Sequence, residues 1–395
     1  MSQPAVPPGD AGPPSGARAE IVVDLDAITH NVATLKQRVG DAAMMTVVKA
    51  DGYGHGLVES ARAARAGGAD WLGVAVLEEA LALRRAGDTG PLLSWLAVPG
   101  EDYAGAIEAG VDLTAYSVAE VDEIAAAARA VGLRARLQLK VDTGLRRGGA
   151  SDAQWPGLVE AAADAEQTGA LRVVGIWSHF ACSDEPDHPS NEAQERAFVQ
   201  ALKVVDAVGL EPEVRHLSNS AGALLRPWSA YDLVRCGIAS YGLSPAPDVV
   251  TSAELGLRPA MTARARLAVV KRLPAGSSVS YGHTWTAERD TVVGVVPAGY
   301  GDGVPRHASS RAPTLVGDRR APVAGRVCMD QFVVDLGPDF DGAVGDPVVL
   351  FGDGADGAPT AQDWAEACDT ISYEIVTRIG GRFTRRHVGG GGITQ

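Results

Sequence analysis

Short runs rich in apolar and β-branched residues alternate with alanine-rich stretches of helical periodicity over most of the first 240 residues. Eight such runs lie at 44–50, 71–76, 92–98, 112–117, 136–142, 173–180, 214–219 and 233–238. Strands separated by amphipathic helices are typical of parallel β-α-β units, and eight units predict a closed (β/α)8 barrel of TIM type, in the α/β class. An open doubly wound sheet is the alternative. It is less favoured because no G-x-G-x-x-G follows the first strand and no Walker sequence occurs.

The pattern changes at about residue 244, where helical periodicity ends. Short β runs bounded by Gly and Pro take over at 262–270, 291–296, 322–334 and 347–351, and a helical segment follows at 361–379. These features predict a second, mainly β domain at the C-terminal end. Pro245 and Pro247 suit a link between the domains, because proline continues neither a helix nor a central strand.

The chain therefore divides into segments of different character. We expect a disordered leader at 1–18, a barrel at 19–244, a mainly β domain at 245–386 and a flexible tail at 387–395. The barrel segment opens with a strand at 20–25, which is assigned to either domain. A helix follows this strand, and Asp24 or Asp26 is expected to cap it.

Charge and cysteine content exclude several classes of function. The formal net charge of -14 would repel nucleic acid and anionic lipid, so neither is an expected partner. The cysteines Cys182, Cys236, Cys328 and Cys368 include no C-x-x-C pair, which argues for reduced thiols in a cytoplasmic protein and against a metal centre. Residues 1–18 lack the features of a secretory signal, and no apolar run is long enough to span a bilayer.

Unusual polar residues follow the predicted strands, at the barrel end where such enzymes place their reactive groups. Lys49 ends the first barrel strand and enters a glycine-rich turn, Ala50 to Gly56. A lysine in such a desolvating mouth is favoured as a free amine, as a Schiff-base nucleophile requires, although a solvated lysine gives the same pattern. The last two strand ends supply the backbone N–H groups of Ser220, Gly237 and Ile238 and a hydroxyl, which favours a phosphate site.

These motifs, from Lys49 to Tyr373, resemble those of alanine racemases, in the fold-type III group of pyridoxal-phosphate enzymes, and appear in the family's order. The resemblance implies that Lys49 forms the Schiff base with pyridoxal 5'-phosphate and acts as one of two catalytic bases. The residues that it assigns to the cofactor, besides Lys49, are Tyr53, Arg147, His179, Asn219, Ser220, Arg235, Gly237, Ile238 and Tyr373.

Arg235 would face the pyridine nitrogen of the cofactor, with His179 hydrogen-bonded behind it. Because arginine does not readily give up a proton, this nitrogen stays unprotonated and the cofactor becomes a weaker electron sink, which suits racemisation better than transamination. A structural ion pair is the alternative for Arg235.

Arg147 would contact the phenolic oxygen of the cofactor and the substrate carboxylate. Carbamylation of Lys140 would turn its repulsion of Arg147 into attraction. The effect of the additional Arg146 is left open.

The β domain would contribute the second base, because one lysine cannot serve both faces of a planar intermediate. Tyr281, in the segment 279–285, matches this base, and His216 would assist it, since the ordinary pKa of tyrosine is near ~10. A tyrosine that merely packs its ring is the alternative. Met329 and Asp330 would line the substrate pocket, and Tyr300 would narrow its entrance. In the family Tyr281, Met329 and Tyr300 enter the other subunit's site, which implies a head-to-tail homodimer with shared sites.

The expected activity is therefore the interconversion of L-alanine and D-alanine, within D-alanine biosynthesis for the cell wall. A broad-specificity amino-acid racemase is the nearest alternative, because few entrance residues decide the substrate. A decarboxylase of the same group would need an acidic partner for the pyridine nitrogen, where this chain has Arg235. A non-catalytic pyridoxal-phosphate carrier would not need Tyr281, and a solute-binding α/β protein would leave the strand-end residues as coincidences.

Overall fold

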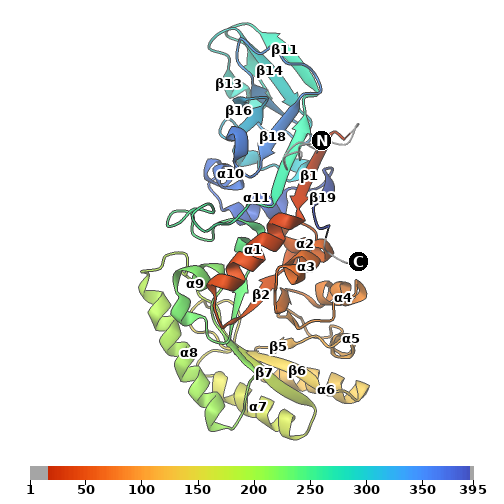
Figure 1. The fold of residues 1–395 in the computed structure, drawn as a ribbon, viewed down its shortest axis with the longest axis vertical. Coiled ribbons are helices and arrows are strands. Elements are labelled where there is room, and N and C mark those ends of the chain that lie inside the picture. Colours follow the sequence, from red (N-terminus) through yellow and green to blue (C-terminus); the bar gives the residue numbers. More distant parts are fainter. Residues whose placement is uncertain (1–16, 392–395) are drawn as a thin grey trace, which may run out of the picture. The chain divides into compact units, whose positions relative to one another are not determined.

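A computed structural model describes residues 17–391, which form two compact units (Figure 1). The barrel unit consists of residues 24–260 and 389–391, and the β unit consists of residues 17–23 and 261–388. Residues 1–16 of the expected leader and residues 392–395 of the expected tail lie outside the described residues. Within the described part of the chain, no helix is both long and apolar enough to cross a membrane.

The barrel unit has eight parallel strands within residues 17–391. They are β2 (Ala43–Val47), β3 (Trp71–Val74), β4 (Leu92–Ser94), β5 (Leu113–Ala115), β6 (Ala135–Lys140), β7 (Leu171–Trp177), β8 (Val214–His216) and β9 (Leu233–Cys236). Two parallel sheets, β4-β3-β2-β9 and β5-β6-β7-β8, contain them. Backbone hydrogen bonds join the sheets on both sides, from Ser94 N to Asp112 O (3.0 Å) and from Arg235 N to Ser218 O (2.9 Å). The predicted closed barrel is confirmed, and an open sheet is excluded.

Helices follow the strands and cover the barrel. They are α1 (Leu25–Arg38), α3 (Leu57–Ala66), α4 (Leu77–Arg85), α5 (Tyr103–Glu108), α6 (Val118–Val131), α7 (Trp155–Gln167), α8 (Pro189–Ala207) and α9 (Ser220–Leu225), with short turns α2 (Lys49–Tyr53), η1 (Pro227–Ser229) and η2 (Ile238–Tyr241). Asp24 caps α1 by accepting from the N–H groups of Asp26 and Ala27. Of the two expected caps, Asp24 is the one used.

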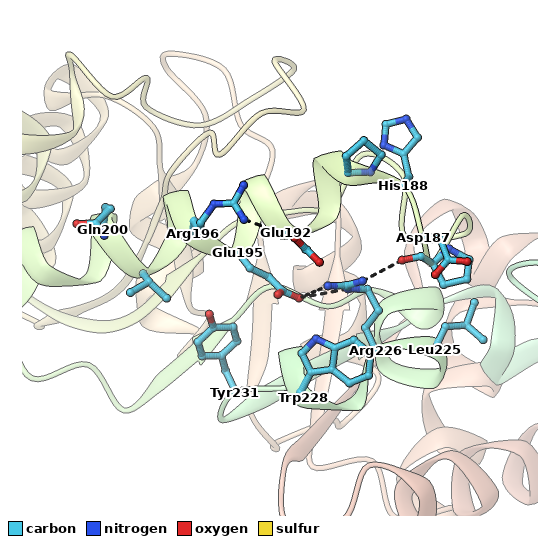
Figure 2. Close-up of a pocket in the computed structure, with 13 residues that line it drawn as sticks. Asp187, His188, Glu192, Glu195, Arg196, Gln200, Leu225, Arg226, Trp228 and Tyr231 are labelled. Carbon is cyan, nitrogen blue, oxygen red and sulfur yellow. Dashed lines mark hydrogen bonds and ion pairs between the residues drawn. The ribbon is translucent and has the colours of Figure 1, made fainter.

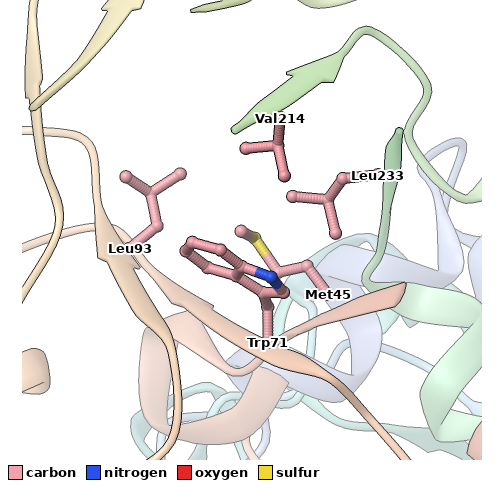
Figure 3. Close-up of a cluster of buried hydrophobic side chains, with 5 residues drawn as sticks. All are labelled: Met45, Trp71, Leu93, Val214 and Leu233. Atoms are coloured by element: carbon pink, nitrogen blue, oxygen red, sulfur yellow. The ribbon is translucent and has the colours of Figure 1, made fainter. Parts of the chain in front are cut away.

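Apolar side chains from five strands or strand edges close one level of the barrel interior (Figure 3). The cluster consists of Met45, Trp71, Leu93, Val214 and Leu233, all buried. His216 and Arg235 come two residues after Val214 and Leu233 and therefore point to the same side of their strands. The alternation along the strands thus places His216 and Arg235 in the barrel interior, next to the apolar cluster and nearer the strand ends.

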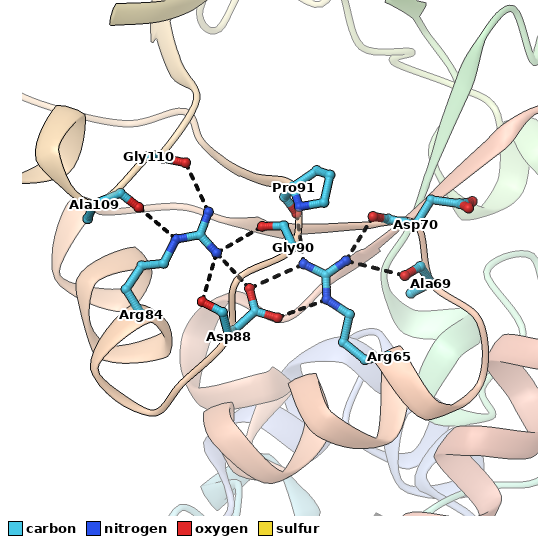
Figure 4. Close-up of polar contacts among 9 residues, drawn as sticks. All are labelled: Arg65, Ala69, Asp70, Arg84, Asp88, Gly90, Pro91, Ala109 and Gly110. Carbon is cyan, nitrogen blue, oxygen red and sulfur yellow. Dashed lines mark hydrogen bonds and ion pairs between the residues drawn. The ribbon is translucent and has the colours of Figure 1, made fainter. Parts of the chain in front are cut away.

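Arginines fasten the barrel loops that precede the strands (Figure 4). Arg65 binds Asp88 through Nε (2.9 Å) and Nη2 (3.2 Å), and Arg84 binds the same carboxylate through Nη1 (2.8 Å). Both guanidinium groups also donate to loop carbonyls, among them Asp70 O, Pro91 O and Ala109 O. We call Arg65, Arg84 and Asp88 the base cluster. It satisfies carbonyl groups ahead of β3, β4 and β5.

The β unit contains a nine-stranded antiparallel sheet, as far as the structure describes the chain. Its order is β11-β14-β17-β16-β15-β18-β10-β1-β19, with β1 (Ala19–Asp24), β10 (Met261–Arg266), β11 (Val269–Leu273), β14 (Thr291–Val296), β15 (Pro313–Val316), β16 (Arg319–Ala324), β17 (Phe332–Asp335), β18 (Pro347–Phe351) and β19 (Thr384–Val388). The opening strand β1 pairs with β10 in this sheet. Between β11 and β14 in the chain, β12 (Ser278–Val279) and β13 (Trp285–Thr286) form a separate small hairpin.

The helical segment expected at 361–379 is two helices. They are α10 (Ala361–Ala367) and α11 (Ser372–Arg378). Cys368 ends the first, and Asp369 then adopts a left-handed conformation (φ 54°), which breaks the helical path. The periodicity of apolar residues continues across this turn, so the sequence pattern alone did not reveal it.

Candidate active site

The chain turns sharply after β2, at Lys49. Positive φ angles occur at Ala50, Asp51, Gly52 and Tyr53. Such conformations are costly for residues other than glycine and need support from their surroundings. Glu79 supplies part of it by accepting from the N–H of Ala50 (2.7 Å) and the N–H of Ala75 (2.9 Å). Asp51 accepts from the N–H of Leu57 (2.9 Å) at the start of α3. The backbone around Lys49 is therefore held in place by hydrogen bonds to the carboxylates of Glu79 and Asp51.

Basic side chains converge at this end of the barrel. Burial lowers the pKa of Lys49, the charges of Arg147 and Arg235 lower it further, and Glu79 acts against them. Burial, followed by Arg235 and Arg147, lowers the pKa of Lys140 to about 7. Within residues 17–391 none of Lys49, Lys140, Arg147 and Arg235 forms an ion pair with a carboxylate. We call these four side chains the mouth cluster. It concentrates positive charge in a chain of net charge -14.

Arg235 is held from several sides and is 4% exposed. Its Nη2 donates to Ser178 O (2.8 Å), Leu217 O (3.1 Å) and His179 Nδ1 (3.1 Å). The guanidinium carbon lies 4.9 Å from the centre of the Trp177 ring. Burial lowers the pKa of Arg235 to about 9, so the group keeps its charge at neutral pH.

His216 does not have a ring nitrogen to offer to Tyr281. Its Nδ1 accepts from Arg235 Nη1 (2.9 Å), and its Nε2 lies 2.7 Å from Gln138 Oε1. The ring is fully buried and stacks on Trp177. Both ring nitrogens of His216 are therefore engaged within the barrel. The sequence did not show which histidine pairs with which neighbour, because His179 and His216 both lie where a strand ends at the mouth.

The predicted phosphate residues lie together where β8 and β9 end. Asn219 caps α9 by accepting from the N–H of Gly222 (3.0 Å), and Ser220 Oγ accepts from the N–H of Gly237 (2.9 Å). A Cβ atom added at Gly237 would lie 2.3 Å from the hydroxyl oxygen of Tyr53, so a larger residue here would displace the Tyr53 hydroxyl. Ile238 begins η2 directly afterwards. The N–H groups of Gly222 and Gly237 are thus bonded within the protein, and the Ser220 hydroxyl lies beside them at the strand ends where such barrels bind phosphate oxygens.

The β unit brings three predicted site segments together. Tyr281, Tyr300 and Met329 are 72%, 40% and 55% exposed. The backbone N–H of Tyr300 donates to Cys328 O (3.0 Å), and Ser280 Oγ donates to Arg326 O (2.6 Å). Exposed aromatic and thioether side chains on adjoining loops form a surface suited to contact.

Two further predicted residues lie in the β unit. Asp330 pairs with Arg382 (2.7 Å), which also binds Asp302 (2.7 Å), so its carboxylate is already engaged. Tyr373 lies in α11 and is half-buried. Among the described residues, no group of three or more His, Cys, Asp or Glu side chains could hold a metal ion.

A separate groove of about 990 Å³ opens beside α8 and η1 (Figure 2). The Arg226 guanidinium binds Glu195 (3.1 Å) across it and lies 5.0 Å from the ring centre of the exposed Trp228. No predicted site residue lines this groove, and both of its arginines are paired with groove carboxylates, Arg226 with Glu195 and Arg196 with Glu192. It is therefore not the candidate active site.

Comparisons with known proteins cover both units. Residues 23–245 match the model of the alanine racemase N-terminal domain, and residues 260–387 match that of the alanine racemase C-terminal domain. An alanine racemase of Frankia casuarinae is 54% identical over 380 residues, which are 96% of this chain and 99% of the relative. Another, from Thermobifida fusca, is 56% identical over 371 residues, which are 94% of this chain and 98% of the relative.

Solved structures agree with these sequence matches. The crystal structure of alanine racemase from Streptomyces lavendulae, a producer of D-cycloserine, superposes with a TM-score of 0.93 at 52% identity. The match covers 95% of this chain and 98% of that one. Barrel, lysine-centred mouth and β unit together define the class of pyridoxal-phosphate enzymes built on a (β/α)8 barrel. Within that class, the chain belongs to the alanine racemase family.

Proposed function

We propose that this chain interconverts L-alanine and D-alanine with pyridoxal 5'-phosphate and two catalytic bases. The observation that carries the proposal is the mouth cluster, in which a lysine amine of lowered pKa lies among cations that lack carboxylate partners within residues 17–391. An anionic cofactor and an amino-acid carboxylate supply the missing negative charge. The relatives named above, which cover nearly the whole chain, support the same activity.

The residues present fit the cofactor, because a cationic mouth adjoins the strand ends where Ser220 and Gly237 lie close to the Tyr53 hydroxyl. Lys49 would hold its aldehyde carbon, and Arg235, supported by His179, would face its ring nitrogen. Its phosphate would lie against Tyr53, Asn219, Ser220, Gly237, Ile238 and Tyr373. When bound, the cofactor supplies an electron-withdrawing ring that weakens the Cα–H bond of the amino acid.

The proton at Cα would be moved by residues on opposite faces. Lys49 serves one face, and its lowered pKa keeps a larger share of the amine free to accept a proton. Tyr281 of the partner subunit serves the other face. We assign its support to His179 rather than His216, because His179 uses Nδ1 with Arg235 while its Nε2 makes no hydrogen bond among the described residues. Through the imidazole ring of His179, Arg235 would stabilise the negative charge of the deprotonated tyrosine.

The remaining residues would orient the substrate. Arg147 would bind the substrate carboxylate and the phenolic oxygen of the cofactor, while Met329, Asp330 and Tyr300 of the partner subunit would shape the pocket. Lys140, with a pKa of about 7, would react with carbon dioxide as a neutral amine, and the resulting carbamate would pair with Arg147.

We further propose a head-to-tail homodimer with two shared sites, located in the cytoplasm and supplying D-alanine for the cell wall. The exposed Tyr281, Tyr300 and Met329 support a contact surface, and the free cysteines suit a reducing compartment. Mixing Lys49→Ala and Tyr281→Phe protomers tests the sharing. Refolded together in equal amounts, they should regain about a quarter of wild-type activity, because hybrid dimers keep one intact site. Continued inactivity of the mixture, with hybrids shown to form, contradicts shared sites.

A panel of D- and L-amino acids tests the activity itself. Loss of optical rotation should be fastest with alanine, in both directions. Comparable rates with serine or basic amino acids would establish a broad-specificity racemase instead. Release of carbon dioxide would establish a decarboxylase, and bound cofactor without turnover would establish a carrier.

A further inference from the structure

A chain of buried side chains crosses the barrel interior below the mouth. Gln138 Nε2 lies 3.0 Å from Asp112 Oδ2, and Gln138 Oε1 lies 2.7 Å from His216 Nε2. His216 Nδ1 lies 2.9 Å from Arg235 Nη1. All four side chains are at most 4% exposed. The chain therefore links Arg235 to a carboxylate on the far side of the barrel through side chains alone.

The direction of every hydrogen bond in this chain follows from its two ends. Asp112 also accepts from Arg136 Nε (2.6 Å), so its oxygens act as acceptors, and Gln138 must turn its NH2 group toward them. A reversed amide would set its oxygen against the carboxylate. The Gln138 oxygen therefore faces His216 and accepts from Nε2–H. At the other end a guanidinium can only donate, so Nδ1 of His216 carries no proton.

This arrangement keeps His216 neutral. Burial and the charge of Arg235 hold the pKa of His216 well below its usual range. A second proton would sit on Nδ1 and point at the guanidinium, with no acceptor for it. The lone pair on Nδ1 consequently always faces Arg235 and fixes one of its amino groups.

The far end of the chain is anchored at the barrel exterior. Arg136 joins Asp112 to Glu213, with Nη2 lying 2.8 Å from Glu213 Oε2. Burial raises the pKa of Asp112, while hydrogen bonds from Arg136 and Gln138 oppose that rise. A charge-paired carboxylate thus sets the orientation of Gln138, although neither residue lies among the predicted site residues.

We propose that Gln138 and Asp112 are positioning residues that hold His216 in the Nε2–H form and thereby aim Arg235 at the ring nitrogen of the cofactor. The claim that Arg235 is aimed at the cofactor rests on the proposed function. The claim that His216 is held in the Nε2–H form does not, since it concerns only the protonation of one histidine. Gln138 lies two residues before Lys140 and therefore faces the same side of β6, which is a signal that the sequence alone carries.

Nitrogen NMR of the ¹⁵N-histidine-labelled holoenzyme tests the claim that His216 is held in the Nε2–H form. His216 should show a protonated Nε2 and an unprotonated Nδ1 throughout the neutral range. Gln138→Leu should lose this fixed form and give a mixture of tautomers, with a changed absorption band of the bound cofactor and a kcat lowered about tenfold or more. KM for alanine should change less, because Gln138 does not touch the substrate.

Thr114→Val is the matched control for this variant. Thr114 is the direct neighbour of Gln138 on β5, is buried, and has a hydroxyl without a hydrogen-bond partner among the described residues. The control should leave both the His216 signals and kcat unchanged. If Thr114→Val lowered kcat as much as Gln138→Leu does, the effect of Gln138→Leu would be explained by altered packing. That result would overturn the proposal.

A double-mutant cycle with His216→Phe tests whether Gln138 acts through the histidine. The loss caused by Gln138→Leu should disappear in the His216→Phe background, and full additivity contradicts the proposal. If Gln138→Leu fails to fold, the wild-type spectrum alone decides, since a proton on Nδ1 of His216 overturns the account. The expected tautomer without any racemisation of alanine would instead refute the proposed function.

Discussion

The base cluster and the mouth cluster lie at opposite ends of the barrel strands and treat their basic side chains differently. At the base, Arg65 and Arg84 share the carboxylate of Asp88 and donate to nearby loop carbonyls. At the mouth, Lys49, Lys140, Arg147 and Arg235 have no ion pair with a carboxylate within residues 17–391, and each lysine has a lowered pKa.

The contrast separates a structural use of charge from a functional one. Buried or half-buried cations cost free energy unless acceptors satisfy them, and the base cluster has its acceptors within the fold. The mouth cluster has no carboxylate partners among the described residues, so the free-energy cost of its partly buried cations is not offset there. A protein keeps such an arrangement where a ligand supplies the opposite charge. Substitutions at the mouth should therefore change catalysis more than stability, and substitutions at the base should do the opposite.

Lys49→Ala should have the largest effect. Loss of both the cofactor attachment and one base should lower kcat/KM for alanine at least about ten-thousandfold. The melting temperature of the cofactor-free protein should not fall, because the variant removes a partly desolvated cation. Steady-state kinetics and calorimetry measure the two quantities. A fall in apoprotein stability with activity retained would place Lys49 with the structural cations.

Tyr281→Phe tests the second base. The substitution should slow racemisation about a hundredfold to a thousandfold, since only the hydroxyl is lost. The cofactor should stay bound, as its absorption band reports. Exchange of the Cα proton with solvent should be lost starting from L-alanine. Loss of the cofactor instead would mean that Tyr281 has a structural role.

Asp88→Ala tests the base cluster. Removing the carboxylate leaves Arg65 and Arg84 without a charged partner and should lower the free energy of unfolding by about 3 kcal/mol. The kcat for alanine should remain within about twofold of wild type at a temperature where the variant is folded. Glu192→Ala, which breaks an exposed pair with Arg196, is the control and should cost less than about 0.5 kcal/mol. Equal costs for the two variants would contradict the role of the base cluster.

Lys140 should show the smallest effect, and one that depends on pH. Because the pKa of Lys140 is about 7, its amine becomes neutral as the pH rises through that value, and reaction with carbon dioxide should increase. Enzyme depleted of carbon dioxide should lose activity a few fold and regain it with bicarbonate. Mass spectrometry and ¹³C NMR detect the carbamate. Unchanged activity after depletion at pH 8 would exclude this role.

The sequence predicted the barrel because eight strand patterns recur, and it predicted the residues near the mouth because they follow those strands. It placed several strand ends too late, as at 44–50, where β2 ends at Val47. The left-handed turn after Lys49 depends on Glu79, which lies 30 residues farther on. Contacts of this kind come from packing, so local patterns could not show them. The partner of each histidine was unpredictable for the same reason.

Reduction of the holoenzyme with borohydride tests the central claim most directly. The reagent fixes the pyridoxyl group on whichever amine holds the cofactor, and peptide mapping then identifies that residue. The mouth offers two lysines of lowered pKa, Lys49 and Lys140, so the experiment distinguishes real alternatives. We expect the visible band to disappear and the label to lie on Lys49. A label on Lys140, or on any other residue, would contradict the proposed mechanism.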